Sequence, residues 1–361
     1  MTIKYIILLI LLVVIILLII IAFSRKKQIP YYKHPLKKIG QIQEDIFNKY
    51  NFKETSNWKL YIPQTYNTIE EELLTVTISG DNKFIFGING CDTFVSKNGL
   101  WSILSDKYGS ELAGKLIPRS YLLYNQADID LFRKEYIPNK PYIMKKNIQR
   151  KQGLKLTSNI AEILEGGQHG YKVVQEYMDN IFLVNSRKLN IRIYILVICD
   201  TSNDIQFYLY NRGKCIYTNK EYNGDIYDME SNITSYKMDI AVYDKSPFTT
   251  DELDIYIKTA FKNKHPRVMD NIKDLMKRVC IPIKNKIFKS ANLGNSTTFQ
   301  LFGCDIILDD NLNPFILEFN KGPEMKPKFK RDYDLKYKLN TDMYNLVGLI
   351  NSRTNYFNRI C

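Results

Sequence analysis

The chain has 361 residues, of which 45% are hydrophobic and 25% are charged. This length and composition exclude wholesale disorder and suffice for two or three domain-sized units around a buried core. Lys and Arg outnumber Asp and Glu by 51 to 38, a formal net charge of +13. This charge favours an acidic partner but does not choose among nucleic acid, anionic lipid, nucleotide phosphates and acidic peptide.

Histidine and cysteine usage points away from a zinc or redox centre. The three histidines, His34, His169 and His265, lie far apart, which argues against a histidine-rich zinc site or a Ser/His/Asp relay. The six cysteines form no close-spaced pair and are typical of buried thiols in a reducing compartment. We therefore expect chemistry based on carboxylates, lysines and arginines.

Residues 5–23 contain no charged side chain and consist mainly of Ile, Leu and Val. As a helix with a rise of about 1.5 Å per residue, this segment matches the thickness of a bilayer's hydrocarbon core. We therefore predict a transmembrane helix over 5–23; the alternative, a cleavable signal peptide, needs a shorter apolar core and a small-residue cleavage site. Basic residues follow closely: Arg25, Lys26, Lys27, Lys33, Lys37 and Lys38. The positive-inside rule then predicts a single-pass membrane protein with a cytoplasmic C-terminal domain and a basic linker over 24–50.

The rest of the chain alternates strand-like and helical segments, which predicts a mixed α/β (α+β) fold. Residues 51–140 are expected to form an N-terminal α/β subdomain, with a strand over 83–86 and a helix over 100–116. Further strands are predicted over 142–144, 171–177, 190–199, 299–308 and 314–319, and helices over 251–261 and 269–288, the last interrupted at Pro282. Arg192 lies inside an apolar strand, where a charged side chain needs a partner.

Residues 299–325 carry the strongest local pattern, two apolar strands separated by turn-forming residues at 309–313. A β-hairpin centred near residues 311 and 312 places Asp305 opposite Glu318, with Asn320 on the same face as Glu318. Opposed carboxylates destabilise a sheet unless a cation lies between them, and two carboxylates with an amide oxygen suit Mg²⁺. The structural alternative is that Asp305 faces solvent while Glu318 pairs with a lysine.

Five segments, in this order, carry cationic or carboxylate side chains at strand ends and loops: Tyr142–Lys145, Arg150–Leu154, Val173–Met178, Arg187–Tyr194 and Glu318–Pro323. In order and spacing they resemble the tubulin tyrosine ligase-like family, and no single segment is decisive. The resemblance covers roughly residues 85–325 and takes in residues 97–121. It implies the ATP-grasp fold, with a central subdomain and lid loop over 141–181, a C-terminal subdomain over 182–350 and a tail over 351–361.

These segments contain side chains that suit ATP. Lys145, at a strand end, can supply a fixed positive charge to the phosphates, and the loop from Arg150 to Gly153 can fold over the triphosphate. The resemblance assigns further roles. Backbone groups of Gln175, Glu176, Tyr177 and Met178 would read the adenine edge, with apolar side chains on either side of the ring. Lys188 and Arg192 would contact the γ-phosphate and acyl phosphate, and Asp305, Glu318 and Asn320 would bind Mg²⁺. Each has a structural alternative, such as a solvated lysine or an arginine in a structural ion pair.

The resemblance implies an ATP-dependent carboxylate-amine ligase. Such an enzyme would add a free amino acid, glutamate, glycine or tyrosine, to a protein or peptide carboxylate through an acyl phosphate. The implied acceptor is an acidic protein such as a tubulin tail, and the basic stretch from Lys321 to Lys338 is a candidate dock for it. Specific nucleic-acid binding is not expected, because no zinc knuckle, helix-turn-helix signal or RNP-like strand is present.

Two departures from the family pattern bear on catalysis. Asn190 replaces an aspartate, and Ile216 stands where the family often carries an arginine that contacts the transferring group. Arg212 or Lys214 is a candidate substitute for that arginine. The departures leave open an alternative function, a non-catalytic, membrane-anchored ATP-grasp pseudoenzyme that acts as a binding module.

Overall fold

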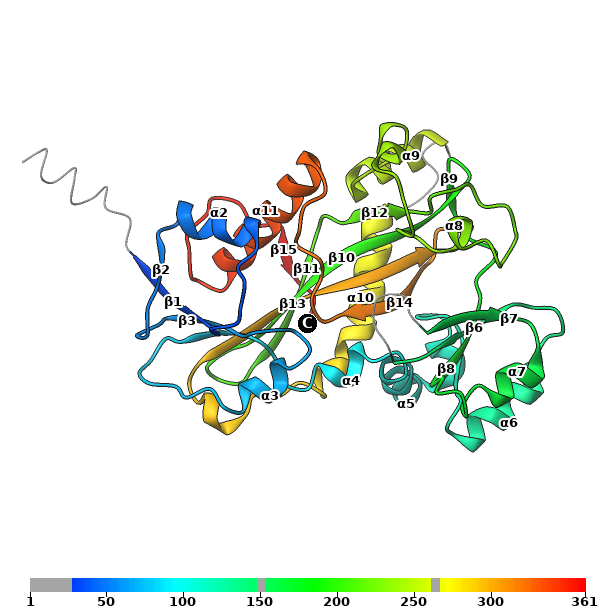
Figure 1. Cartoon of the computed structure of the whole chain (residues 1–361), viewed down its shortest axis with the longest axis horizontal. Helices are drawn as coiled ribbons and strands as arrows, with labels where there is room; N and C mark the ends of the chain where they lie inside the picture. Colours follow the sequence, from blue (N-terminus) through cyan, green and yellow to red (C-terminus); the bar gives the residue numbers. More distant parts are fainter. Residues whose placement is uncertain (1–27, 148–152, 261–266) are drawn as a thin grey trace, which may run out of the picture.

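The computed structural model describes residues 28–147, 153–260 and 267–361 of the chain (Figure 1). Their strands form two sheets, a large mixed sheet and a four-stranded antiparallel sheet. The prediction of a mixed α/β fold is confirmed.

The large sheet contains 11 strands of the described ranges, in the order β15-β11-β10-β13-β4-β3-β1-β2, with β9 and β12 paired to β10 and β14 paired to β13. The strands are β1 (Ile29–Lys33), β2 (Phe52–Glu54), β3 (Leu60–Ile62), β4 (Phe84–Phe86), β9 (Leu183–Val184), β10 (Arg187–Cys199), β11 (Ile205–Tyr210), β12 (Lys214–Tyr217), β13 (Thr297–Leu308), β14 (Pro314–Asn320) and β15 (Phe357–Arg359). The long strands β10 and β13 pair antiparallel at the centre and are almost wholly buried, as their continuous Ile, Leu and Val runs predict.

Helix α10 (Val268–Lys284) packs its apolar stripe on the large sheet (Figure 1). Pro282 lies inside its last turn, and the helix continues to Lys284 rather than breaking there as predicted. A proline cannot donate to the carbonyl four residues earlier, which here belongs to Arg278. The Tyr108 hydroxyl donates to that carbonyl at 2.7 Å, so the hydrogen bond lost at Pro282 is replaced by a tertiary contact.

The small sheet has the order β5-β8-β6-β7 and consists of β5 (Ser120–Leu122), β6 (Tyr142–Lys145), β7 (Leu154–Thr157) and β8 (Val173–Glu176). Helices α6 (Gln126–Glu135) and α7 (Ile160–Glu165) bury Phe132 and Ile163 against it. The sequence placed the start of this unit at residue 141, whereas β5 and α6 come earlier in the chain. A short strand such as β5 shows too little periodicity to be assigned before its partner β8 is known.

Residues 28–50 differ from the predicted linker, because they contain β1 and α2 (Gln41–Lys49). Strand β1 pairs in parallel with both β2 and β3 and so extends the large sheet. The ring of Phe47 on α2 lies 4.6 Å from that of Tyr31 on β1 and 6.0 Å from that of Tyr344 on α11 (Lys330–Leu346). This aromatic packing joins the two ends of the described chain.

The prediction of a membrane anchor is not upheld. In the described ranges, no helix is both long and apolar enough to cross a bilayer. Helices α10 and α11, at 17 residues each, carry charged side chains along their length. The predicted span, residues 5–23, lies outside the described residues. We therefore withdraw the single-pass, cytoplasmic-domain placement and the membrane partner that followed from it.

The remaining helical segments are α3 (Ile69–Leu73), α4 (Asp92–Val95), α5 (Gly99–Ala113), α8 (Met229–Asn232), α9 (Thr250–Ala260), η1 (Ile240–Asp244) and η2 (Ala291–Leu293). Helix α9 agrees with the predicted helix over 251–261, and α5 with that over 100–116.

Candidate active site

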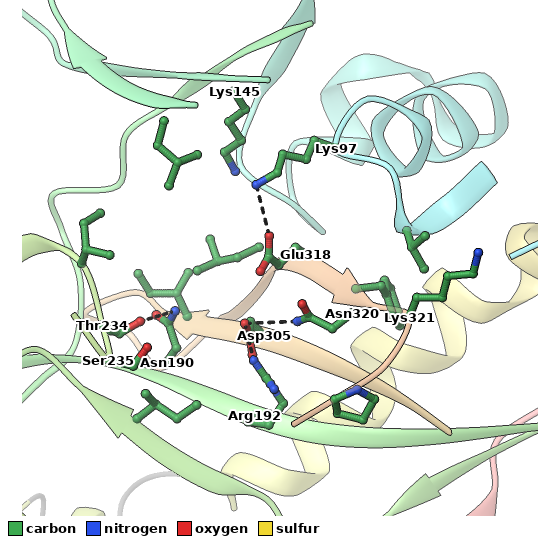
Figure 2. A pocket seen from close by; sticks show the side chains of 18 of the residues that line it. Lys97, Lys145, Asn190, Arg192, Thr234, Ser235, Asp305, Glu318, Asn320 and Lys321 are labelled. Atoms are coloured by element: carbon green, nitrogen blue, oxygen red, sulfur yellow. Dashed lines mark hydrogen bonds and ion pairs between the residues drawn. The ribbon is translucent and has the colours of Figure 1, made fainter. Parts of the chain in front are cut away.

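A cavity of about 1010 Å³ lies between the small sheet and the β10, β13 and β14 strands of the large sheet (Figure 2). It is large enough for a nucleotide together with part of a second substrate. The predicted site residues that line it are Lys145, Gln175, Glu176, Tyr177, Met178, Lys188, Arg192, Asp305, Glu318 and Asn320. Residues from five strands, β6, β8, β10, β13 and β14, thus share one ligand-sized space.

The β13–β14 hairpin supplies the acidic side chains. Asp305 pairs with Glu318 in the register that the sequence predicted, and the Asn320 amide donates to the Asp305 carboxylate at 3.4 Å. The register shifts by one residue between Asp305 and Ile306, which leaves Leu317 as the extra residue of a β-bulge. Because the bulge interrupts the two-residue alternation, the neighbours Leu317 and Glu318 both line the cavity.

Arg192 on β10 is the partner that the sequence required, and it binds Asp305. The two residues are paired across strands, with Nε at 2.5 Å from Oδ1 and the terminal guanidinium nitrogen at 2.9 Å from Oδ2 (Figure 2). Burial lowers the pKa of Arg192, but the charge of Asp305 and its hydrogen bonds outweigh burial and leave the pKa raised. This bidentate pair gives each of the two groups a hydrogen-bonded partner in a nearly buried position.

Gly303 makes room for that pair. A Cβ at this position would lie 3.1 Å from both Arg192 Cδ and Pro323 Cβ, so the arginine side chain crosses the strand where Gly303 leaves space. Sequence reasoning did not single out this glycine, because its backbone conformation is ordinary and only the tertiary neighbour explains it.

We expect Gly303→Ala to lower the free energy of unfolding by about 1 kcal/mol, because the added methyl group must displace the Arg192 side chain or Pro323. Urea denaturation of the variant and the wild type measures the difference. Gly114→Ala is the matched control, since its nearest atoms lie at 3.4 Å and its backbone is helical, so it is expected to be neutral or stabilising. Equal losses in the two variants would contradict this account of Gly303.

Two lysines stand above the acidic hairpin. Lys97, between α4 and α5, lies 3.6 Å from the Glu318 carboxylate (Figure 2). Lys145 on β6 donates to the Gln175 side chain at 2.6 Å, and burial together with the nearby charge of Lys97 lowers its pKa to about 8. Lys97 was missed as a site residue, and its one sequence signal was its place at the start of the segment 97–121 in the family resemblance.

Lys188 on β10 lies between two aromatic rings. Its ammonium is 4.4 Å from the ring centre of Tyr177 and 4.1 Å from that of Tyr222. It donates to the Tyr177 hydroxyl and, at 3.0 Å, to the Asn232 side chain. Burial lowers the pKa of Lys188 to about 7, with the charge of Asp179 opposing it. The side chain is therefore held in place and easily deprotonated while no anion is bound.

The end of the cavity at the small sheet is apolar and suits a flat ring. Its lining includes Ile143, Leu154, Met178, Ile307 and Leu317. The Glu176 and Tyr177 amides already donate to backbone carbonyls of Arg119 and Pro141. Among the described residues no hydrogen bond is found for the Met178 amide, which leaves it to meet a ligand edge.

Two residues predicted to read adenine through their backbone have side chains that are engaged elsewhere. The Gln175 side chain is buried and, besides accepting from Lys145, donates to the Pro118 carbonyl and the Ser120 hydroxyl. The Glu176 carboxylate pairs with Lys140 at 2.8 Å. The side chain of Gln175 therefore orients Lys145, and that of Glu176 is turned to a neighbouring lysine.

Three predicted residues lie apart from the cavity or outside the described chain. Arg212 does not line the cavity; it lies 3.5 Å from Asp251 and 4.0 Å from the ring centre of Tyr356. Gly153 has a positive φ of 74° and forms the turn that begins β7, where other residues would be strained. Arg150 lies outside the described residues.

The basic stretch proposed as a dock is largely neutralised by its own helix. Asp332, Asp334 and Asp342 pair with Lys336, Lys330 and Lys338 respectively, and Arg331 pairs with Glu252. Lys214, the other candidate substitute, is buried and lies 2.8 Å from Asp332. These cations are therefore less available to an acidic partner than their sequence suggests.

The donor set fits a magnesium ion. Asp305, Glu318 and Asn320 present carboxylate and amide oxygens on one face of a hairpin, toward a cavity that has room for water and phosphate oxygens. In the structure Arg192 and Lys97 neutralise the two carboxylates. A divalent cation would take over that role and release the ammonium of Lys97 for phosphate.

Known proteins of one family are similar to this chain in sequence. A sequence profile of the tubulin-tyrosine ligase family matches residues 87–355. A Tetrahymena thermophila protein named probable alpha-tubulin polyglutamylase Ttll1 is 26% identical over 266 residues, which are 67% of this chain and 62% of that protein. The Xenopus tropicalis tubulin polyglutamylase TTLL7 is 28% identical over 261 residues, 62% of this chain and 27% of that protein.

The chain spans only part of the relatives that it matches. The match covers 62% of the Tetrahymena protein, 27% of the Xenopus protein and 22% of the human tubulin polyglutamylase TTLL7. The family profile begins at residue 87. The strands β1–β4 and the loops between them therefore lie outside the matched part.

Proposed function

Because the chain belongs to the tubulin-tyrosine ligase family, we propose that it is an ATP-dependent ligase of ATP-grasp fold that joins an amino acid to a carboxylate of an acidic protein. One observation carries the proposal: the cross-strand pair Asp305–Glu318, with Asn320, shares a cavity with the cations Lys97, Lys145 and Arg192. Acidic ligands for Mg²⁺ and basic ligands for phosphate are thus arranged around one space.

The reaction proceeds in two balanced steps. An acceptor carboxylate oxygen attacks the γ-phosphorus of ATP, ADP leaves, and an acyl phosphate forms. The amine of the amino acid then attacks the acyl carbon, inorganic phosphate leaves, and the amine loses a proton as the amide forms. Mg²⁺ held by Asp305, Glu318 and Asn320 would neutralise charge on the phosphates.

The chain's own side chains position the substrates in these steps. Lys145, oriented by Gln175, and Lys188, held between two tyrosines, line the same cavity as Met178, which supports a role for both in binding the nucleotide phosphates. Arg192 holds Asp305 in place and presents its guanidinium to the same cavity. No protein nucleophile is required, and catalysis rests on charge neutralisation.

Glutamate is the proposed amino acid, and an acidic tail such as that of tubulin the proposed acceptor, because the named relatives are polyglutamylases. Incubating the full chain with ATP, Mg²⁺, glutamate and tubulin tests this. Mass spectrometry should detect tail peptides heavier by one or more glutamyl residues, with ADP formed in equal amount. Tails of unchanged mass after complete ATP turnover would refute the ligase.

One observation supports a second candidate, a binding module without ligase activity. The corner of the cavity formed by Asn190, Ile216 and Thr234 carries no formal charge, and Asn190 donates to the Thr234 hydroxyl at 2.9 Å. A neutral corner binds a charged amine or acyl phosphate less strongly than a charged one. Tight Mg²⁺-dependent ATP binding without incorporation of any amino acid is the result that favours the module.

Affinity for ATP should fall as the pH rises from 7 to 9, by up to roughly tenfold per pH unit for each of two lysines. Without a ligand, the amines of Lys188 and Lys145, with pKa values of about 7 and about 8, lose their protons as the pH rises from 7 to 9. Phosphates favour the ammonium forms, so binding takes up protons in that window and weakens as pH rises. Calorimetric titration in two buffers of different ionisation enthalpy measures the uptake, and a zero value at pH 8 contradicts the assignment.

A further inference from the structure

One wall of the cavity comes from residues that precede the part of the chain matched by the family. Gln64, Thr65, Tyr66 and Asn67, in the loop between β3 and α3, line the cavity together with Lys37. The family profile begins at residue 87. What this wall recognises is therefore a property of this chain's own residues.

The wall is fixed by the strands that flank it. Strand β3 pairs in parallel with β1 and β4, and β4 pairs with β13, so the loop is attached to the sheet that carries Asp305. At the base of the loop the Glu72 carboxylate accepts hydrogen bonds from the Tyr61 hydroxyl at 2.7 Å and from the Gln64 amide at 2.9 Å. Both of these hydrogen bonds of the Glu72 carboxylate therefore stabilise the loop itself.

Tyr66 packs the loop against the residues that follow the β13–β14 hairpin. A Cβ on Gly322 would lie 2.1 Å from the Tyr66 ring, so the ring occupies the space that this glycine leaves, two residues after Asn320. Burial raises the pKa of the Tyr66 hydroxyl to about 12. The loop therefore reaches the cavity beside the predicted Mg²⁺ ligands and away from the apolar end at Met178.

Lys37 stands out among the cations at this end. Lys97 is paired with Glu318, and Lys321 is paired with Asp92. For Lys37, half buried, the described ranges contain no ion pair; its ammonium lies 5.4 Å from the Tyr66 ring centre. Burial lowers its pKa, with only the charge of Glu72 acting in the other direction. Such an ammonium on a cavity wall is poised to gain an anionic partner.

We propose that Lys37, positioned by Tyr66 on Gly322, forms a carboxylate-binding subsite of the cavity. The proposal rests on the ligase function and specifies which side of the cavity receives the carboxylate-bearing substrate. The carboxylate comes either from an acidic side chain of the acceptor, next to the one that is modified, or from the free amino acid. The chemistry is the same for both, and binding measurements separate them.

The test uses the full chain with Mg²⁺ and a non-hydrolysable ATP analogue. Fluorescence anisotropy with a labelled oligoglutamate peptide and calorimetric titration with free glutamate report the two sources at equilibrium. Lys37→Met keeps the apolar stem over Tyr66 and removes the charge, Lys37→Arg keeps a charge, and Lys38→Met is the matched control at an exposed neighbour that does not line the cavity.

Lys37→Met should weaken binding of one of the two carboxylate ligands about tenfold, while Lys37→Arg keeps most of it and Lys38→Met all of it. A loss confined to the peptide identifies the acceptor, and a loss confined to glutamate identifies the amino acid. Unchanged binding of both ligands overturns the proposal, as does an equal loss in Lys38→Met or an equal loss of affinity for the ATP analogue.

The outcomes keep this proposal distinct from the ligase function. If wild type incorporates no amino acid but binds oligoglutamate through Lys37, the ligase function fails and the subsite stands. If wild type ligates normally and Lys37→Met binds both carboxylate ligands as well as wild type does, the subsite fails and the ligase function stands.

Discussion

Replacing Arg192 by methionine is expected to lower the free energy of unfolding by about 3 kcal/mol, because it leaves the nearly buried Asp305 carboxylate without its bidentate partner. Urea denaturation measures the change. Arg212→Met is the matched control: the Arg212–Asp251 pair is exposed and 3.5 Å long, so its loss should cost less than about 1 kcal/mol.

A double variant separates the structural role of the pair from its role in binding. Arg192→Met combined with Asp305→Leu should recover at least half of the lost stability, because both charges are then gone. Despite this recovered stability, the double variant should bind no ATP in the presence of Mg²⁺. If the double variant binds ATP as wild type does, Arg192 and Asp305 form a structural ion pair and the site lies elsewhere.

Replacing Glu318 by glutamine is expected to slow ligation about a thousandfold or more, because a neutral amide is a poor Mg²⁺ ligand and less charge on the transferring phosphate is neutralised. Stability should change by no more than about 0.5 kcal/mol, since the Glu318 side chain is 38% exposed and its contact with Lys97 is 3.6 Å long. Initial rates of glutamate incorporation at saturating ATP measure the effect.

The control for Glu318 lies on the same hairpin. Asp310 is exposed at the turn, and Asp310→Asn removes one negative charge there without touching the cavity. Its ligation rate should equal that of wild type. Equal loss in the two variants would mean that hairpin charge, and not metal binding, explains the result.

Local patterns predicted the elements that position the acidic half of the site. Strand alternation and turn residues place Asp305 opposite Glu318, and the structure confirms this pair. The pairs nearer the turn are displaced by one residue from the predicted register, and the bulge at Leu317 makes up the difference. The hairpin prediction succeeds because strand pairing across a short turn depends on residues that are close in the sequence. Arg192, as a charged residue in an apolar strand, was expected to need a partner, and Asp305 is that partner. The need of Arg192 for a partner was predicted, but the sequence did not identify that partner, which lies 113 residues away.

Features that depend on tertiary neighbours escaped the sequence. The clearance at Gly303 and the contact of Lys97 with Glu318 join segments whose proximity no periodicity encodes. The β-bulge at Leu317 is an irregularity within the predicted hairpin that strand alternation does not foresee. The N-terminal region was misjudged for the same reason, since charges suggested a linker while Phe47 packs against Tyr344 from the other end of the chain. Arg212 pairs with Asp251 outside the cavity, and sequence spacing does not reveal this partner.

The proposed function requires a magnesium-bearing nucleotide bound between the hairpin and the small sheet. Calorimetric titration of the full chain with ATP, in Mg²⁺ and then in excess chelator, tests this most directly when wild type and Glu318→Gln are compared. We predict that wild type binds ATP at least about tenfold more tightly with Mg²⁺ than without, and that Glu318→Gln loses this difference. An affinity that is indifferent both to Mg²⁺ and to the substitution would contradict the account.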